Sequence, residues 1–131
     1  MLAFIKNPIF RTENPETVFE ITPKFILFNK YVIGKVYESS FEVRNVSVIA
    51  HQMRAIPPKT QFFSLSLGQY PQGQSVIAPG LSASFNVRFV PDSLCTFEDE
   101  ILVECSNGSK IRVPLIAKRE SPSLSSKLIF E

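Results

Sequence analysis

Hydrophobic and polar residues alternate with a period of two along most of the chain. The alternation is clearest in two stretches, residues 37–45 and 81–90. This period places successive side chains on opposite faces of a β-strand, so we expect one face of each strand to be buried and the other to meet water. The inward residues predicted for these and the last two strands, which form the expected core, are Phe41, Val43, Phe85, Val87, Phe89, Ile101, Val103, Val113 and Leu115.

Turn-forming residues divide this pattern into about seven short strands, the number typical of an immunoglobulin-like sandwich. Pro57-Pro58 ends one strand, Ala78-Pro79-Gly80 precedes another, and Asn107-Gly108 is a strong hairpin signal between the last two. The strands are predicted at residues 25–28, 37–45, 51–55, 61–67, 81–90, 97–105 and 111–117. No stretch shows a helical period. We therefore predict an all-β fold in which two antiparallel sheets pack face to face.

The chain of 131 residues is long enough for one domain with two flanking tails. Residues 1–20 contain proline and asparagine without a clear period and are expected to be a lead-in. Residues 21–118 form the predicted sandwich. Residues 119–131 begin as a serine-rich linker and end in Lys127-Leu128-Ile129-Phe130. This end resembles Lys24-Phe25-Ile26-Leu27-Phe28, which leads to the hypothesis that a following repeat starts there.

Charge distribution and the N-terminal sequence argue against several classes of partner. Fourteen Lys and Arg stand against twelve Asp and Glu, so the net charge is +2, and the basic residues are spread along the chain. This distribution predicts neither nucleic-acid binding nor attraction to an anionic membrane. The apolar run before Lys6 is too short for a secretory signal or a membrane span. We therefore expect a cytoplasmic protein without membrane insertion.

The residue types needed for catalysis or metal binding are scarce. His51 is the only histidine, and it alternates with Met53 and Ala55 on an inward or rim side, so we expect it to be structural. Cys95 and Cys105 are separated by an extended segment that would hold their sulfur atoms too far apart for a disulfide. Together with His51 they also lack the spacing of a zinc site. We therefore predict no catalytic residue, no metal and no cofactor.

Outward charged residues on neighbouring strands are expected to face one another. The expected pairs are Glu98, Glu100 and Glu104 with Arg112 and Arg54, and Arg88 with Glu38 or Glu42. Exposed pairs of this kind contribute only about 0.2–1 kcal/mol each. They matter here because they put glutamates on the outer face of a predicted sheet.

Prolines, glycines and aromatic residues at fixed offsets in residues 22–118 resemble those of a known family. The motifs are Phe41-x-Val43-x-Asn45, Pro57-Pro58 followed by Phe62-Phe63, Ala78-Pro79-Gly80, Phe85-x-Val87-x-Phe89-x-Pro91, Phe97-x-Asp99-x-Ile101-x-Val103 and Val113-Pro114-Leu115-Ile116-Ala117. In these motifs the chain is similar to the ASH (ASPM, SPD-2, Hydin) branch of the major-sperm-protein and PapD-like superfamily, and most like the repeats of Hydin and related proteins of motile cilia. The resemblance implies a sandwich domain of cilia, centrosomes and related cytoskeletal structures, usually without catalysis.

The resemblance also implies a scaffold module that binds protein partners at an axoneme, a centrosome or a basal body. We expect loops and an exposed sheet edge to make the contacts, in residues 57–63 and 68–73. The candidate partner-binding residues are Lys59, Gln61, Phe62, Gln69, Tyr70 and Gln72. Of the adjacent pair Phe62 and Phe63, one is expected in the core and the other beneath a loop. Leu67 is expected to point inward, in phase with the start of its strand.

Two other functions fit the same fold. One is an adaptor like the VAMP-associated proteins, which bind an acidic peptide on a basic sheet face. The glutamates expected on the comparable face here argue against carrying that site over. The other is a structural spacer whose surfaces are covered by neighbouring repeats. A hydrolase or carbohydrate-binding domain is disfavoured because paired carboxylates and aromatic platforms are lacking.

Pro114 stands inside the last predicted strand, where it interrupts the alternation of Ile111, Val113, Leu115 and Ala117. Proline has no backbone N–H, so its position must lie at an open edge or at a bulge. An uninterrupted apolar edge strand would invite pairing with other chains. We therefore interpret Pro114 as a residue that limits such pairing.

Overall fold

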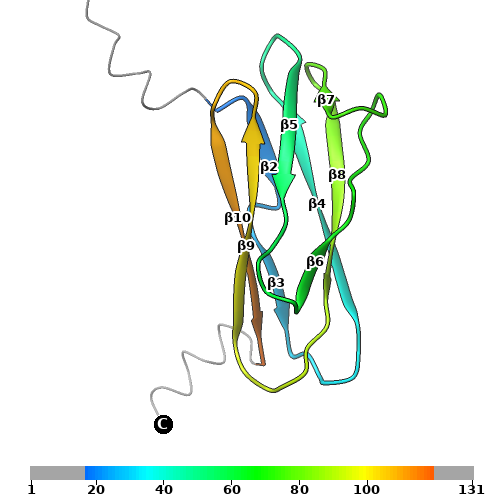
Figure 1. Ribbon diagram of the computed structural model, residues 1–131, viewed down its shortest axis with the longest axis vertical. Coiled ribbons are helices and arrows are strands. Elements are labelled where there is room, and N and C mark those ends of the chain that lie inside the picture. Colours follow the sequence, from blue (N-terminus) through cyan, green and yellow to red (C-terminus); the bar gives the residue numbers. More distant parts are fainter. Residues whose placement is uncertain (1–16, 120–131) are drawn as a thin grey trace, which may run out of the picture.

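Two β-sheets pack face to face in the computed structural model, which describes residues 17–119 (Figure 1). The strands described in this range are β2 (Phe19–Thr22), β3 (Ile26–Asn29), β4 (Tyr37–Asn45), β5 (His51–Ile56), β6 (Phe63–Leu65), β7 (Val76–Ile77), β8 (Ser82–Phe89), β9 (Phe97–Cys105) and β10 (Lys110–Lys118). One sheet has the order β3-β10-β9-β5-β7 and the other β2-β4-β8-β6. The prediction of an all-β sandwich of two sheets is confirmed. No helix in the described range is long and apolar enough to cross a membrane.

The described range contains nine strands where about seven were expected, for two local reasons. The first is β2, which precedes the first predicted strand and begins within the predicted lead-in. Val18 and Phe19 are buried, so these two residues already belong to the packed sandwich. The second is β7, a strand of two residues that pairs with His51 and Gln52 at the start of β5. Strands this short leave too little alternation for a sequence pattern to show.

The first two described strands, β2 and β3, belong to different sheets. β2 pairs antiparallel with β4, from Phe19 opposite Asn45 to Thr22 opposite Glu42. The chain then crosses the sandwich, and β3 pairs with the second half of β10. This pair is parallel, unlike every other strand pair in the described range and unlike the antiparallel sheets that were predicted. It is parallel because β3 joins the sheet after a crossing and not through a hairpin with β10.

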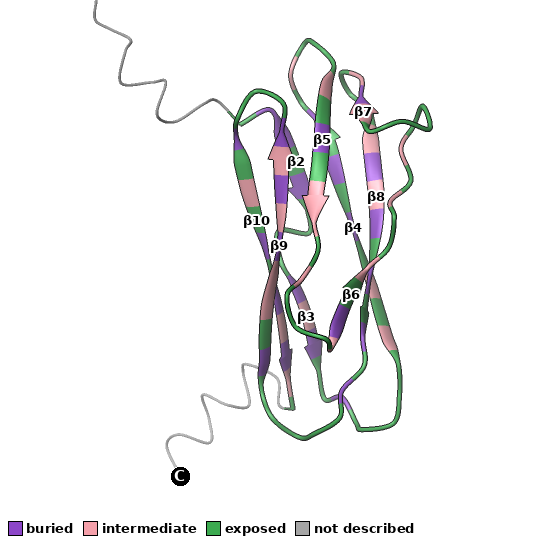
Figure 2. Cartoon of the chain, in the orientation of Figure 1, coloured by how far each residue is buried: buried purple, intermediate pink, exposed green. Residues whose placement is uncertain are grey.

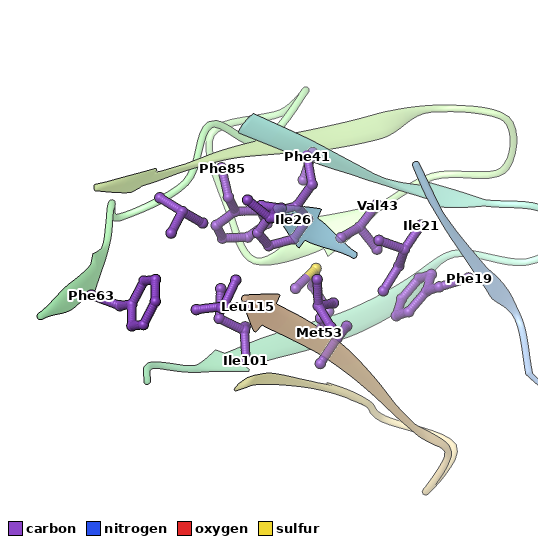
Figure 3. Packing of buried hydrophobic residues seen from close by; sticks show 14 of the residues in the cluster. Phe19, Ile21, Ile26, Phe41, Val43, Met53, Phe63, Phe85, Ile101 and Leu115 are labelled. Carbon is purple, nitrogen blue, oxygen red and sulfur yellow. The ribbon is translucent and has the colours of Figure 1, made fainter. Parts of the chain in front are cut away.

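The core lies between the sheets and is rich in aromatic rings (Figure 3). Phe89 has no exposed surface, and its ring centroid lies 4.9 Å from that of Phe63 and 5.3 Å from those of Phe28 and Phe97. Figure 2 shows buried and more exposed residues alternating along the strands. All nine residues predicted to form the shared core are buried, which confirms the predicted strand parity.

Asn45, at the end of β4, has a fully buried polar side chain. Its Nδ2 donates to the carbonyl oxygens of Ile49 at 2.8 Å and Ile77 at 2.7 Å, and its Oδ1 accepts from the Ser47 N–H at 2.8 Å. A buried amide without partners would cost about 1–3 kcal/mol. Asn45 therefore fixes the loop of residues 46–50 and ties β4 to β7 across the sandwich.

Replacement of Phe89 by Ala is expected to lower the free energy of unfolding by about 3–5 kcal/mol, because it opens a cavity among closely packed rings. Chemical denaturation followed by circular dichroism measures this loss. The matched control is Phe25→Ala, since Phe25 is 52% exposed and should lose much less. Equal losses in the two variants would contradict the core described above.

Candidate functional site

The first candidate segment, residues 57–63, is held against β9 by the carboxylate of Asp99. This carboxylate accepts hydrogen bonds from the Thr60 N–H at 2.8 Å, the Thr60 hydroxyl at 2.7 Å and the Lys59 N–H at 3.2 Å. Partial burial by itself raises the pKa of the Asp99 carboxyl, but these bonds and one from the Glu100 N–H outweigh burial and lower the pKa below its ordinary value. The ionised carboxylate thus fixes the course of the loop.

The two phenylalanines at the end of this segment have different roles. Phe63 is buried in the core, whereas Phe62 is half-buried with its ring centroid 4.7 Å from that of Phe97. This confirms that one ring belongs to the core and the other packs beneath the loop. Lys59 and Gln61 are exposed. Only part of Phe62, and the polar side chains beside it, are therefore accessible to a partner.

The second candidate segment follows β6 and lies against β8. Gln69 pairs with Ser84 through two backbone hydrogen bonds of 2.8 and 3.0 Å. The ring of Tyr70 meets Phe85 edge-on with centroids 5.9 Å apart, and burial raises the pKa of the Tyr70 phenol. Gln72 is exposed beyond these contacts. The loop is therefore anchored at its base by Gln69 and Tyr70.

Two shallow pockets flank this second segment. Pro57 and Tyr70 both line the first, which has a volume of about 320 Å³, so the structure brings the two candidate segments together there. Gln69 and Ser84 line the second, with a volume of about 390 Å³. The predicted residues that line neither pocket are Lys59, Gln61, Phe62 and Gln72.

Leu67 lines both pockets and is 97% exposed, so its expected inward orientation is wrong. Ser66 and Gln69 both pair with β8, which leaves Leu67 and Gly68 together opposite the single residue Phe85. This β-bulge turns Leu67 outward. Gly68 has a φ of +85°, and a Cβ there would lie 2.4 Å from the Phe85 ring, so glycine is needed. A glycine directly after the last apolar residue of a strand is the signal that could have indicated the bulge.

Ion pairs connect neighbouring strands on the outer faces of both sheets. The pairs are Arg54 with Glu104 at 2.9 Å, Arg112 with Glu100 at 2.7 Å and Arg88 with Glu38 at 3.0 Å. These pairs confirm the predicted facing for Glu100, Glu104 and Glu38. Glu98 instead stands opposite Ile116 of β10 and takes part in none of these pairs. All three arginines remain exposed, so each pair contributes little to stability. The outer face of β9 and β10 carries both signs of charge, unlike the basic face expected of a VAMP-associated adaptor.

His51 and Cys105 serve packing, and the Sγ of Cys95 lies 3.5 Å from the Ser93 hydroxyl oxygen. His51 is half-buried, and its ring meets Phe19 edge-on with centroids 6.3 Å apart. Cys105 is buried and Cys95 is exposed, and both are free thiols, as predicted. Within residues 17–119, no three His, Cys, Asp or Glu side chains are grouped so that they could hold a metal ion.

Hydrogen bonds at the two ends of β10 show which way its backbone groups point. Directly before the strand, the Ser109 C=O accepts from the Cys105 N–H of β9 at 2.9 Å. At its end, the Lys118 C=O accepts from the Lys30 N–H, on the side of β3, at 2.9 Å. Successive residues of a strand point these groups to opposite sides. The odd-numbered residues of β10 therefore face β9, and the even-numbered residues face the side where β3 lies.

The first half of β10, Lys110–Pro114, has an open edge on that side. β3 pairs with β10 only from Leu115 onward, so no described strand faces the backbone groups of Lys110, Arg112 and Pro114. Pairing with β9 runs without a bulge from Lys110 to Ala117. Of the two explanations offered for Pro114, the structure therefore supports the open edge: the missing N–H would point outward. The second half of β10 is a central strand.

A groove of about 600 Å³ runs beside this open edge, between β2 and β10. Its lining residues are Thr17, Phe19, Glu20, Ile21, Lys24, Lys110, Ile111 and Arg112. The sequence did not indicate this groove, because β2 lay at the border of the predicted lead-in. The groove depends on two segments that are almost ninety positions apart in the chain.

These features define a class of fold, the immunoglobulin-like sandwich that PapD-like domains share. The structure superposes on the ASH / PapD-like domain of human CEP192 with a TM-score of 0.65 and 17% identity, covering 90% of this chain and 92% of that one. The chain belongs to the family of the Deleted in lung and esophageal cancer protein 1 Ig domain, whose family model matches residues 19–120. The resemblance to ASH and PapD-like domains inferred from the sequence is confirmed.

Two much longer proteins are similar to this chain in sequence. The Homo sapiens protein named Deleted in lung and esophageal cancer protein 1 is 35% identical over 122 residues, which cover 88% of this chain and 7% of that protein. The Chlamydomonas reinhardtii Cilia- and flagella-associated protein 221 homolog is 27% identical over 111 residues, which cover 85% of this chain and 17% of that protein. The chain thus spans less than a fifth of the length of either relative.

The lowered pKa of Asp99 predicts a pH-dependent contribution to stability. In the unfolded chain the pKa of this carboxyl is about 3.9. The pKa of Asp99 is lower in the folded chain than in the unfolded chain, so ionised Asp99 stabilises the fold. This contribution to the free energy of unfolding is fully present above the unfolded pKa and is lost as pH falls through the folded pKa. Asp99→Asn should therefore destabilise the protein more at about pH 7 than at about pH 3. Urea denaturation at both pH values, with the exposed Asp92→Asn as control, checks this; a pH-independent loss would contradict it.

Replacement of Pro114 by Val adds a backbone N–H to the open edge of β10. We expect the variant to stay folded and to self-associate more than the wild type, because an unpaired edge with all its donors is a template for another strand. Sedimentation velocity at matched concentrations measures the monomer fraction. Pro71→Val, in the exposed loop after β6, is the control. An unchanged monomer fraction in Pro114→Val would show that the proline does not protect this edge.

Proposed function

We propose that this chain is a non-catalytic protein-interaction module of a ciliary or centrosomal protein. The observation that carries the proposal is its similarity, over 85% of the chain, to a protein named as cilia- and flagella-associated. Its resemblance to ASH domains supports the same assignment. We propose cytoskeletal proteins as its partners, and the axoneme, basal body or centrosome as its location.

The contact surface that we propose lies around Leu67, between the two pockets. Leu67 is held on both sides by residues paired with β8, so the backbone at this position has little freedom to lose on binding. Tyrosine is among the residues that commonly dominate protein interfaces, and Tyr70 lines the pocket beside Leu67. Gln69 supplies polar groups beside them. The predicted residues that would form the rim of this surface are Lys59, Gln61, Phe62 and Gln72.

A second candidate function is that of a structural spacer between repeats. Exposed apolar residues at both ends of the sandwich favour it. The exposed residues are Val46, Val48, Ile49 and Leu81 at one end and Val32, Ile33, Val36 and Leu94 at the other. Figure 1 shows the loop between β4 and β5 at the opposite end from the loop between β3 and β4. Neighbouring domains stacked end to end would cover both groups.

Affinity purification from ciliated cells, with the 131-residue chain as bait, is expected to recover identified axonemal, basal-body or centrosomal proteins. Leu67→Glu should reduce their recovery several-fold without changing thermal stability, because Leu67 makes few contacts of its own. The matched control is Val48→Glu, since Val48 is 90% exposed at one end of the sandwich.

The possible outcomes separate the two functions. Loss of recovery with Leu67→Glu alone supports the interaction surface, whereas loss with Val48→Glu alone supports end-to-end stacking. If the wild-type chain recovers no protein of cilia or centrosomes, the proposed function is wrong.

A further inference from the structure

The open edge of β10 offers backbone groups to which another strand can bind. The N–H and C=O groups of Lys110 and Arg112 point away from β9, and no described strand lies opposite them. β3 occupies the same side of β10 from Leu115 onward. An incoming strand would therefore continue the row that β3 begins, and it would gain main-chain hydrogen bonds from a preformed template.

The groove beside this edge has room for the side chains of such a strand. Its floor is apolar, because Phe19 and Ile21 are buried and Ile111 is half-buried. Side chains of the incoming strand would alternate between this floor and the outer face of the sheet. The positions that face the groove therefore favour apolar residues, and the positions that share the outer face with Lys110 and Arg112 are open to charged ones.

Basic side chains outnumber acidic ones around the groove, with Lys24, Lys110 and Arg112 against Glu20. No carboxylate of residues 17–119 forms an ion pair with Lys24. The other two pair with glutamates of β9, yet the side chains of Arg112 and Lys110 are 71% and 62% exposed and remain accessible. Cross-strand pairs of opposite charge are favourable, so this edge favours an acidic strand.

A second copy of the chain fits the same edge poorly. Antiparallel two-fold pairing that uses the whole open edge would place Arg112 opposite Arg112, and like charges directly opposite are destabilising. It would also place Lys110 opposite Pro114, which has no N–H to donate. These two features act against self-pairing but not against an acidic strand from another protein.

We infer that the open edge of β10 binds an extended acidic segment of a partner protein, which adds to the five-stranded sheet as a further strand. The bound segment carries apolar residues over the groove and acidic residues opposite Lys110 and Arg112. This inference rests on the proposed function as a protein-interaction module, and it assigns that function a second surface, on the other side of the sandwich from Leu67.

A blocked heptapeptide, Glu-Val-Glu-Val-Glu-Val-Glu, is the probe for this site. Titration into the full chain is followed by amide hydrogen exchange, measured by nuclear magnetic resonance. The amides of Lys110 and Arg112 should exchange about tenfold more slowly when about nine tenths of the molecules are bound, because exchange then occurs from the unbound tenth. The amides of Ile111 and Val113 already face β9 and should change much less.

Matched variants and peptides separate strand addition from simple charge attraction. Arg112→Glu should weaken peptide binding by about three- to tenfold, as expected when an attractive surface charge becomes repulsive. The control Arg88→Glu reverses a similarly exposed and paired arginine on the other sheet and should leave binding unchanged. The same peptide with N-methyl groups on the amides that face β10 keeps its charge and should fail to bind. The Lys-Val-Lys-Val-Lys-Val-Lys peptide should also fail.

Several results would overturn the inference. The first is that the acidic peptide does not bind at millimolar concentration, and the second is that the N-methylated peptide binds equally well. The third is that the Lys110 and Arg112 amides already exchange slowly in the free chain. The last result would mean that the chain itself, or a second copy, covers the edge. Affinity purification with Arg112→Glu separates the two proposals: if it recovers the same ciliary proteins as the wild type, the edge is not the binding site while the proposed function stands.

Discussion

The arrangement of this sandwich depends on the crossing of the chain from one sheet to the other between β2 and β3. A partner strand satisfies the backbone groups at a sheet edge, and β2 provides one for β4 while β3 provides one for the second half of β10. The segment of residues 17–29 is too short to cover both edges along their whole length. The open edge at Lys110–Pro114 and the groove beside it follow from this limit, and Pro114 lies where a free donor would otherwise be exposed.

The candidate surfaces are rigid because each loop is anchored to a strand by a specific contact. Asp99 on β9 holds the loop before β6 through three hydrogen bonds to Lys59 and Thr60. Phe85 on β8 lies beneath both Gly68 and Tyr70, so one core residue supports the bulge and the ring beside it. Core and surface are therefore coupled, and the residues that stabilise the fold also hold the loops in the shape that a partner would meet.

Much of this could be expected from the sequence, because strand parity is a local property. The parity of residues such as Phe41 and Ile101 predicted the core, and the outward parity of Arg54 and Glu104 predicted their ion pair across two strands. Of the six candidate contact residues predicted from the sequence, only two line the pockets beside Leu67. Gln69 and Tyr70 line pockets, but Leu67, the most exposed apolar side chain between them, was assigned to the wrong face by a bulge that alternation does not reveal.

The sequence by itself determined the all-β class, the buried face of each long strand, the free cysteines and the family resemblance, because each of these is encoded in residue types at short and regular spacing. Only the tertiary structure decided that β2 and β3 belong to different sheets, that β3 runs parallel to β10 and that β2 and β10 enclose a groove. The physical reason is that sheet membership depends on hydrogen bonds between residues far apart in the chain, and several alternative pairings satisfy the same local pattern equally well.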